Sequence, residues 1–95
     1  MNHETASDQA LNAAKRFRHY RKVRNMTAKE VSAVSGVPYS TLRRFEQSGE
    51  ISFVSLVKLA DALRLEKEID ALFGEMPPST IEELFRMKSG LGPRR

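Results

Sequence analysis

Hydrophobic side chains in this chain recur every three or four residues, the spacing that places them along one face of an α-helix. The first run predicts a helix capped by Asp8 and ending near Arg24. Its inward residues are expected to be Leu11, Ala14, Phe17 and Tyr20, with Arg21 alongside Tyr20. Two shorter helices are predicted over residues 28–35 and 39–47. Their inward residues are expected to be Val31 and Val34 in the first, and Leu42 and Phe45 in the second.

The second half of the chain keeps the same helical spacing. Ser52 is placed to cap a helix over 53–63, in which Leu56, Leu59, Ala60 and Leu63 follow the i, i+3, i+4, i+7 pattern. A fifth helix over 66–73 carries Ile69, Leu72 and Phe73. Beyond the breaker GEMPP at 74–78, a short helix is predicted over 80–88. No strand pattern appears, so the predicted fold class is all-α: a compact five-helix domain with an appended C-terminal helix.

Residues 27–47 have the signature of two helices joined by a tight turn. Thr27 and Glu30 form a capping-box pattern at the start of the first helix, with Met26 before it as a hydrophobic staple. Gly36 stands at the turn, where a positive φ is tolerated only by glycine at little cost. Pro38 then suits the first turn of a new helix.

This stretch resembles the helix-turn-helix of the Cro/cI-type (lambda-repressor-like, XRE) DNA-binding domains. The matching positions are Ser32, Gly36, Val37, Leu42 and Phe45, followed by Glu46, Gly49 and residues 55–65. The similarity extends over residues 15–73. It implies a DNA-binding function and an ion pair between Arg21 and Glu46, which would fix the second helix of the motif and could also orient Arg21 toward a phosphate. The alternative is that the two side chains are solvated independently of each other. Ala28, Pro38 and Tyr39 depart from the family pattern, so the preferred bases are not predicted.

The family's mode of docking implies which side chains meet DNA, because the N-terminal half of the second helix enters the major groove. The residues expected to read bases are Tyr39, Ser40, Arg43 and Arg44. For both arginines the alternative is phosphate contact without sequence information. The residues expected to contact the DNA backbone are Arg18, Thr27, Lys29 and Thr41. Relatives bind as dimers, with two such helices about 34 Å apart, so a homodimer on an inverted repeat is expected.

The charge distribution agrees with a nucleic-acid partner. Residues 10–49 carry nine Lys or Arg and two Asp or Glu, a net charge of +7, whereas residues 50–88 have a net charge of −3. A basic half that contains the motif favours DNA on that side of the molecule. The alternative for a run such as 15–18 is an ordinary solvated helix face.

Length and composition predict one small domain in three parts. Residues 1–7 are expected to be disordered, 8–73 to form the DNA-binding domain, and 74–95 to provide a linker, a short helix and a basic tail. The chain has no cysteine, which excludes disulfides and thiolate metal sites and fits a reducing compartment. Without a signal peptide or long apolar run, we expect a cytoplasmic, nucleoid-associated protein that does not enter a membrane.

Enzyme functions find no support in the residues. The two histidines, His3 and His19, have no metal-ligand partners at useful spacing. No serine lies in a nucleophile elbow, and no glycine-rich phosphate loop is present. We therefore expect a non-enzymatic protein without a cofactor, in which His19 is a surface or phosphate-proximal residue.

The segment from Gly49 to Lys88 resembles, more loosely, the small antitoxins that partner HipA-type serine/threonine kinase toxins. That similarity implies a repressor of its own operon that holds a kinase in a complex. The apolar stripe of Ile81, Leu84 and Phe85 is then expected to form a protein interface, with a kinase or a second copy. The alternatives are a stand-alone phage-type or chromosomal repressor, and a helical protein-interaction module without specific DNA binding.

Overall fold

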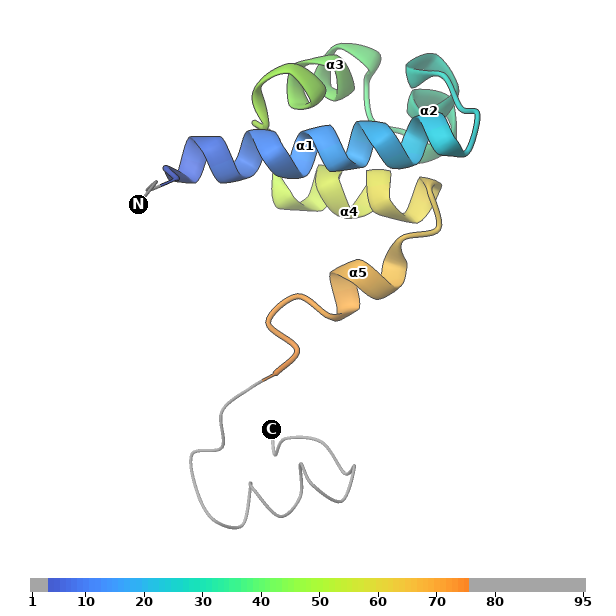
Figure 1. The fold of residues 1–95 in the computed structure, drawn as a ribbon. Coiled ribbons are helices and arrows are strands. Elements are labelled where there is room, and N and C mark those ends of the chain that lie inside the picture. The colour runs from blue at the N-terminus through green and yellow to red at the C-terminus, as the bar shows by residue number, and fades with distance from the viewer. Residues whose placement is uncertain (1–3, 76–95) are drawn as a thin grey trace, which may run out of the picture.

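The computed structural model describes residues 4–75, and this part of the chain is all helical, as the sequence predicted. Its five helices are α1 (Ala6–Val23), α2 (Ala28–Ser35), α3 (Tyr39–Ser48), α4 (Phe53–Ala62) and α5 (Glu66–Asp70). The C-terminal helix predicted over 80–88 lies outside the described residues. In Figure 1, α1 runs along the whole body, with α2 and α3 on one side of it and α4 on the other.

The first helix begins earlier than the sequence analysis predicted. Thr5 is its N-cap: the Thr5 hydroxyl accepts a hydrogen bond from the Asp8 amide at 3.0 Å, and the Asp8 carboxylate accepts one from the Thr5 amide at 3.1 Å. Asp8 is therefore the third helical residue of a capping box and not the cap. Ala6 and Ser7, expected to be disordered, belong to the helix.

The core is formed by residues from α1, α2, α3 and α4 together with the turn between α2 and α3. The buried hydrophobic side chains are Ala14, Phe17, Ala28, Val31, Val37, Leu42, Phe45, Leu59, Ala60 and Leu63. The rings of Phe17 and Phe45 meet edge to face with centroids 5.6 Å apart, which ties α1 to α3. The predicted inward stripe of α4 is confirmed, with Leu56 only partly buried at its edge.

Two residues predicted to face inward are exposed. Tyr20 is 36 % exposed, because the buried stripe of α1 continues from Phe17 to Arg21, one helical turn later. Val34 is 65 % exposed, since the chain turns after α2 and Val37 fills the apolar position instead. The residue of this turn that lies in the interior is therefore Arg21 and not Tyr20. Because Arg21 is charged, its burial requires a partner.

Two glycines shape the turns that hold the motif together. Gly36 ends α2 with φ of 77°, and Gly49 ends α3 with φ of 83°. A Cβ at Gly49 would lie 2.6 Å from the backbone of Ala10 and Leu11, so α1 passes directly against the end of α3. Glycine is therefore required at position 49 by both conformation and space.

The last described helix is shorter than predicted. It ends at Asp70, whereas the sequence analysis extended it to Phe73. Phe73 has a left-handed backbone conformation with φ of 56°, which an α-helix does not accommodate, and its side chain is 85 % exposed. Leu72 is also exposed, so of the predicted inward residues only Ile69 is partly buried. None of the helices within residues 4–75 combines the length and the hydropathy needed to cross a membrane.

Candidate nucleic-acid interface

The residues expected to read bases lie along the outer side of α3. Tyr39 is 44 % exposed, Ser40 and Arg44 are also exposed, and Arg43 is half-buried. The opposite side of the same helix places Leu42, Phe45 and Glu46 in the interior. Because both sets come from one rigid helix, α3 offers a polar and basic surface to a partner while it is anchored from behind.

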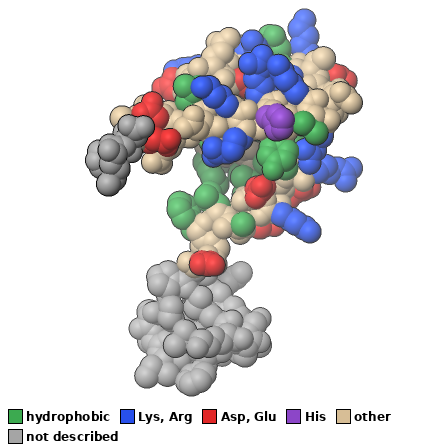
Figure 2. Space-filling model, in the orientation of Figure 1, with side chains coloured by type: hydrophobic (Ala, Val, Ile, Leu, Met, Phe, Trp, Pro, Cys, Tyr) green, Lys and Arg blue, Asp and Glu red, His purple; other side chains and the backbone are tan. Residues whose placement is uncertain are grey.

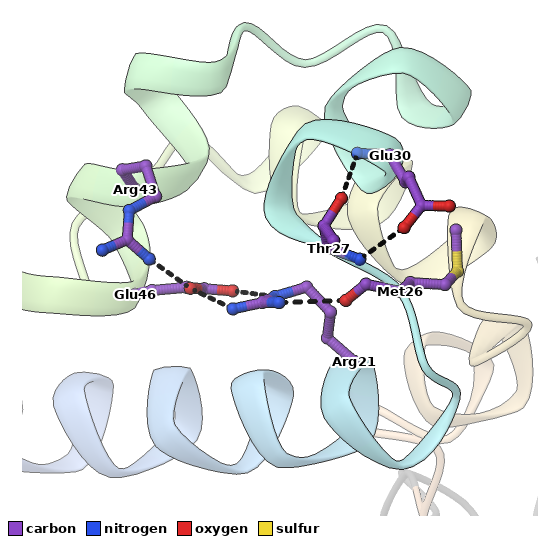
Figure 3. A network of polar contacts seen from close by, with 6 residues as sticks. All are labelled: Arg21, Met26, Thr27, Glu30, Arg43 and Glu46. Carbon is purple, nitrogen blue, oxygen red and sulfur yellow. Dashed lines mark hydrogen bonds and ion pairs between the residues drawn. The ribbon is translucent and has the colours of Figure 1, made fainter.

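That anchor is the ion pair between Arg21 of α1 and Glu46 of α3, shown in Figure 3. Arg21 Nε donates to Glu46 Oε2 at 2.7 Å, and Arg21 Nη2 donates to Oε1 at 3.0 Å. The third nitrogen, Nη1, donates to the carbonyl oxygen of Met26 at 3.0 Å. The Arg21 side chain is only 8 % exposed, so most of it is committed to the interior, and a contact between Arg21 and a phosphate stays a prediction.

Glu46 has a second arginine partner that the sequence analysis missed. Arg43 Nη1 donates to Glu46 Oε1 at 3.2 Å, across one turn of α3, as Figure 3 shows. The i, i+3 spacing of Arg43 and Glu46 was the available signal, because side chains three apart on a helix are neighbours. Arg44 forms a different kind of pair, with Glu50 at 3.1 Å, in which both side chains are largely exposed.

The start of α2 is closed by its own residues. The Thr27 hydroxyl accepts a hydrogen bond from the Glu30 amide at 3.1 Å, and the Glu30 carboxylate accepts one from the Thr27 amide at 2.9 Å. The hydrogen bond from the Thr27 backbone lowers the pKa of Glu30, with a smaller contribution from the Thr27 side chain. A carboxylate therefore already occupies this helix terminus, at which Thr27 and Lys29 are expected to contact the DNA backbone.

The start of α3 is open in comparison. Its N-cap is Pro38, which provides no side-chain hydrogen bond, and no acidic residue lies in its first turn. The free amides at a helix N-terminus and the helix dipole attract anions such as phosphate. Lys29 of α2 lies over the Tyr39 ring at 5.9 Å, which adds a positive charge beside this open terminus.

The other predicted backbone contacts are accessible to different degrees. Lys29 and Arg18 are exposed, on α2 and α1, and Thr41 is half-buried on α3. His19 is also exposed on α1. In Figure 2, Lys and Arg side chains gather over α1, α2 and α3, while Asp and Glu lie mainly at the N-terminal end of α1 and toward α5. No cluster of three or more His, Asp or Glu suited to a metal ion occurs within residues 4–75.

The domain is all helical, and its two short helices α2 and α3 are joined by a glycine turn, with a polar face on α3. These features define a helix-turn-helix DNA-binding domain. A family model described as helix-turn-helix (HTH_3) matches residues 17–69, more than half of the chain. The chain therefore belongs to this family of XRE-type DNA-binding, non-enzymatic domains. A search of curated proteins found no significant match. The predicted partner interface, Ile81, Leu84 and Phe85, lies outside the described residues.

Proposed function

We propose that this protein is a sequence-specific transcriptional regulator that reads duplex DNA with the outer face of α3. The observation that carries the proposal is the position of Tyr39, Ser40 and Arg44, exposed together on the second helix of the motif. The major groove of B-DNA admits one α-helix and presents hydrogen-bonding groups that differ between base pairs. Arginine suits the two acceptors of guanine, and serine can donate or accept.

The electrostatics of the described helices support the same function. The basic half of the chain forms α1, α2 and α3, and the N-terminus of α3 carries no acidic side chain. Phosphate contacts supply most of the affinity of such domains, while base contacts supply the discrimination. The proposal assigns the first role to Lys29, Thr41, Arg18 and Thr27, and the second to the outer face of α3.

The proposal includes a homodimer on an inverted repeat. One α3 reaches only a few base pairs, so a single copy would have little selectivity. Two copies related by a two-fold axis would place both α3 helices in successive turns of the major groove. Sedimentation velocity with and without operator DNA would test this, and a strictly monomeric complex would contradict it.

We further propose that the protein represses its own operon and serves as the antitoxin of a HipA-like kinase. This rests on the sequence similarity over residues 49–88 alone, with Ile81, Leu84 and Phe85 as the interface residues. A stand-alone repressor is the alternative. Co-expression with the product of an adjacent kinase-like reading frame, followed by purification of one partner, separates the two.

Salt dependence provides the direct test of DNA binding. If a dimer neutralises about eight phosphates, log affinity should fall against log salt with a slope of about −7. Fluorescence anisotropy with a duplex from the protein's own upstream region, between about 50 and 200 mM salt, measures this slope. A nearly flat dependence would contradict the proposal and favour a protein-interaction module.

A further inference from the structure

The carboxylate of Glu46 holds two arginines that have different tasks. Its Oε1 atom accepts a hydrogen bond from Arg21 Nη2 at 3.0 Å and another from Arg43 Nη1 at 3.2 Å. The Glu46 side chain is only 1 % exposed, whereas the Arg43 side chain is 34 % exposed. The contact therefore joins a group fixed in the interior to a group at the edge of the outer face of α3.

We infer that Glu46 is a positioning residue for Arg43, so that the buried ion pair of the fold sets how this arginine meets a base. The inference deepens the proposed function and rests on it. It gives Glu46 a role in DNA specificity in addition to its role in holding α1 and α3 together. It also gives Arg21 an indirect role, because Arg21 fixes both oxygens of the same carboxylate.

The hydrogen-bonding capacity of Arg43 allows both contacts at once. Arg43 uses Nη1 for Glu46, and within residues 4–75 its Nε and Nη2 atoms have no hydrogen-bond acceptor. In Arg21 the same Nε–Nη2 edge makes a two-bond contact with a carboxylate. A guanine presents two acceptors in the major groove, which suit such an edge. Arg43 can thus remain on Glu46 while it binds a base.

Positioning matters because a free arginine loses rotamer freedom when it binds. A side chain already held in one orientation loses less, so more of the interaction appears as affinity for the correct base. Arg44 lacks this support: its partner Glu50 is itself largely exposed, and exposed ion pairs constrain side chains weakly. The two arginines should therefore respond differently when Glu46 is removed.

The test compares Arg43→Ala in two backgrounds, the natural chain and the double variant Arg21→Met/Glu46→Leu. The double variant removes both buried charges together, which proteins often tolerate when the replacements are apolar and of similar volume. In the natural chain, Arg43→Ala should lower the affinity ratio of operator to random DNA about 5- to 150-fold. In the double variant the same substitution should lower it less than about threefold.

Arg44→Ala is the matched control in both backgrounds. If Glu46 positions Arg43 specifically, Arg44→Ala should reduce the ratio by the same factor in each. An unchanged effect of Arg43→Ala in the double variant would overturn the inference. Equal weakening of both arginine effects would also overturn it, because that result indicates a displaced α3 and a purely structural role for Glu46.

A measurement on the natural chain covers the case in which the double variant does not fold. Nuclear magnetic resonance relaxation of arginine Nε reports side-chain order on the picosecond-to-nanosecond scale. The side chain of Arg43 should be more ordered than that of the exposed Arg18, and its degree of order should be closer to that of Arg21. An Arg43 as mobile as Arg18 would overturn the inference while leaving DNA binding intact. If the natural chain does not distinguish operator from random DNA, the inference falls together with the proposed function.

Discussion

The two faces of α3 are built from different interactions, although they belong to the same ten-residue helix. The inner face buries Leu42, Phe45 and Glu46, each at most 6 % exposed. The outer face leaves Ser40 and Arg44 in solvent and Tyr39 at 44 % exposure. The difference teaches that stability and recognition are separable on this helix: one face is satisfied within the fold, and the other has hydrogen-bonding groups left for a partner.

Arg43 lies between the two faces and connects them. Its contact with Glu46 links an inner-face carboxylate to an arginine expected to read bases. Substitutions of the apolar residues on the inner face should therefore change stability, and substitutions on the outer face should change binding. The contact between Arg43 and Glu46 should couple the two. The following predictions would break or refine this division.

The largest effect is expected from Glu46→Ala on the inner face. The substitution leaves the buried guanidinium of Arg21 without its carboxylate, and breaking a buried pair in this way costs about 3–5 kcal/mol of the free energy of unfolding. Urea denaturation followed by circular dichroism measures the loss. A small domain has about 5–15 kcal/mol in total, so the variant should be close to unfolding at 37 °C.

A double-mutant cycle with Arg21→Ala shows whether the two residues act as a pair. If they are coupled, the double variant should be less destabilised than the sum of the two single variants. Strictly additive effects would mean that Arg21 and Glu46 contribute independently, and the inner face would then owe its stability to the apolar side chains alone.

The next effect concerns the outer face. Arg44→Ala should change the free energy of unfolding by no more than about 0.5 kcal/mol, because the lost ion pair with Glu50 is exposed. Specific DNA binding should weaken by about 1–3 kcal/mol if Arg44 contacts a base. Anisotropy titrations with operator and random duplexes measure the two affinities, and an equal loss on both assigns Arg44 to a phosphate.

Lys58→Ala is the control for charge. Lys58 is exposed on α4, outside the proposed DNA surface, and its removal changes the net charge by the same amount. It should leave the operator-to-random ratio unchanged. A loss like that of Arg44→Ala would show that net charge, and not the outer face of α3, determines binding.

A smaller effect is expected at the start of α2, where the chain caps a helix with its own side chains. Thr27→Ala removes the hydroxyl that accepts from the Glu30 amide and should cost about 0.5–2 kcal/mol of unfolding free energy. Thr27→Ser keeps the acceptor and should restore most of it. If Thr27→Ala weakens DNA binding more than it weakens the fold, the threonine also contacts the DNA backbone.

The sequence predicted the architecture well because each signal was local. The sequence signals for helix ends depend only on neighbouring residues. The structure shows the predicted N-caps at Thr27 and Ser52 and the predicted glycine turn at Gly36. The boundary of α1 was wrong because Thr5 and Asp8 form a capping box in which the aspartate is not the cap. A pattern of spacing identifies both ends of such a box but does not by itself tell which end starts the helix.

Tertiary choices were harder to predict. Helical spacing alone could not decide between Tyr20 and Arg21 for the interior of α1, because the decision depends on Glu46 of α3, 25 residues away. The Arg43–Glu46 contact was missed for a related reason: its i, i+3 spacing is visible, but its importance comes from the burial of Glu46. Which bases α3 reads is a property of the complex and has no local signal in the chain.

The smallest predicted effect is a pH dependence of stability at the start of α2. The hydrogen bond from the Thr27 backbone lowers the pKa of Glu30 below its ordinary value of 4.5 in the folded state. The contribution of the ionised carboxylate to stability is therefore fully present above about pH 4.5 and is lost as the pH falls through the lower, folded-state pKa. The Thr5 backbone lowers the pKa of Asp8 at the start of α1 in the same way, so Asp8 contributes a pH dependence of the same sign.

The experiment compares the unfolding free energy of the natural chain with that of the Glu30→Gln variant. Because Asp8 is present in both proteins, the difference between them reports on Glu30 alone. The difference in unfolding free energy between the two proteins should shrink as the pH is lowered from 6 to 3. A difference that stays constant over that range would mean that the charge of Glu30 does not stabilise the start of α2, and that its hydrogen bond alone closes this terminus.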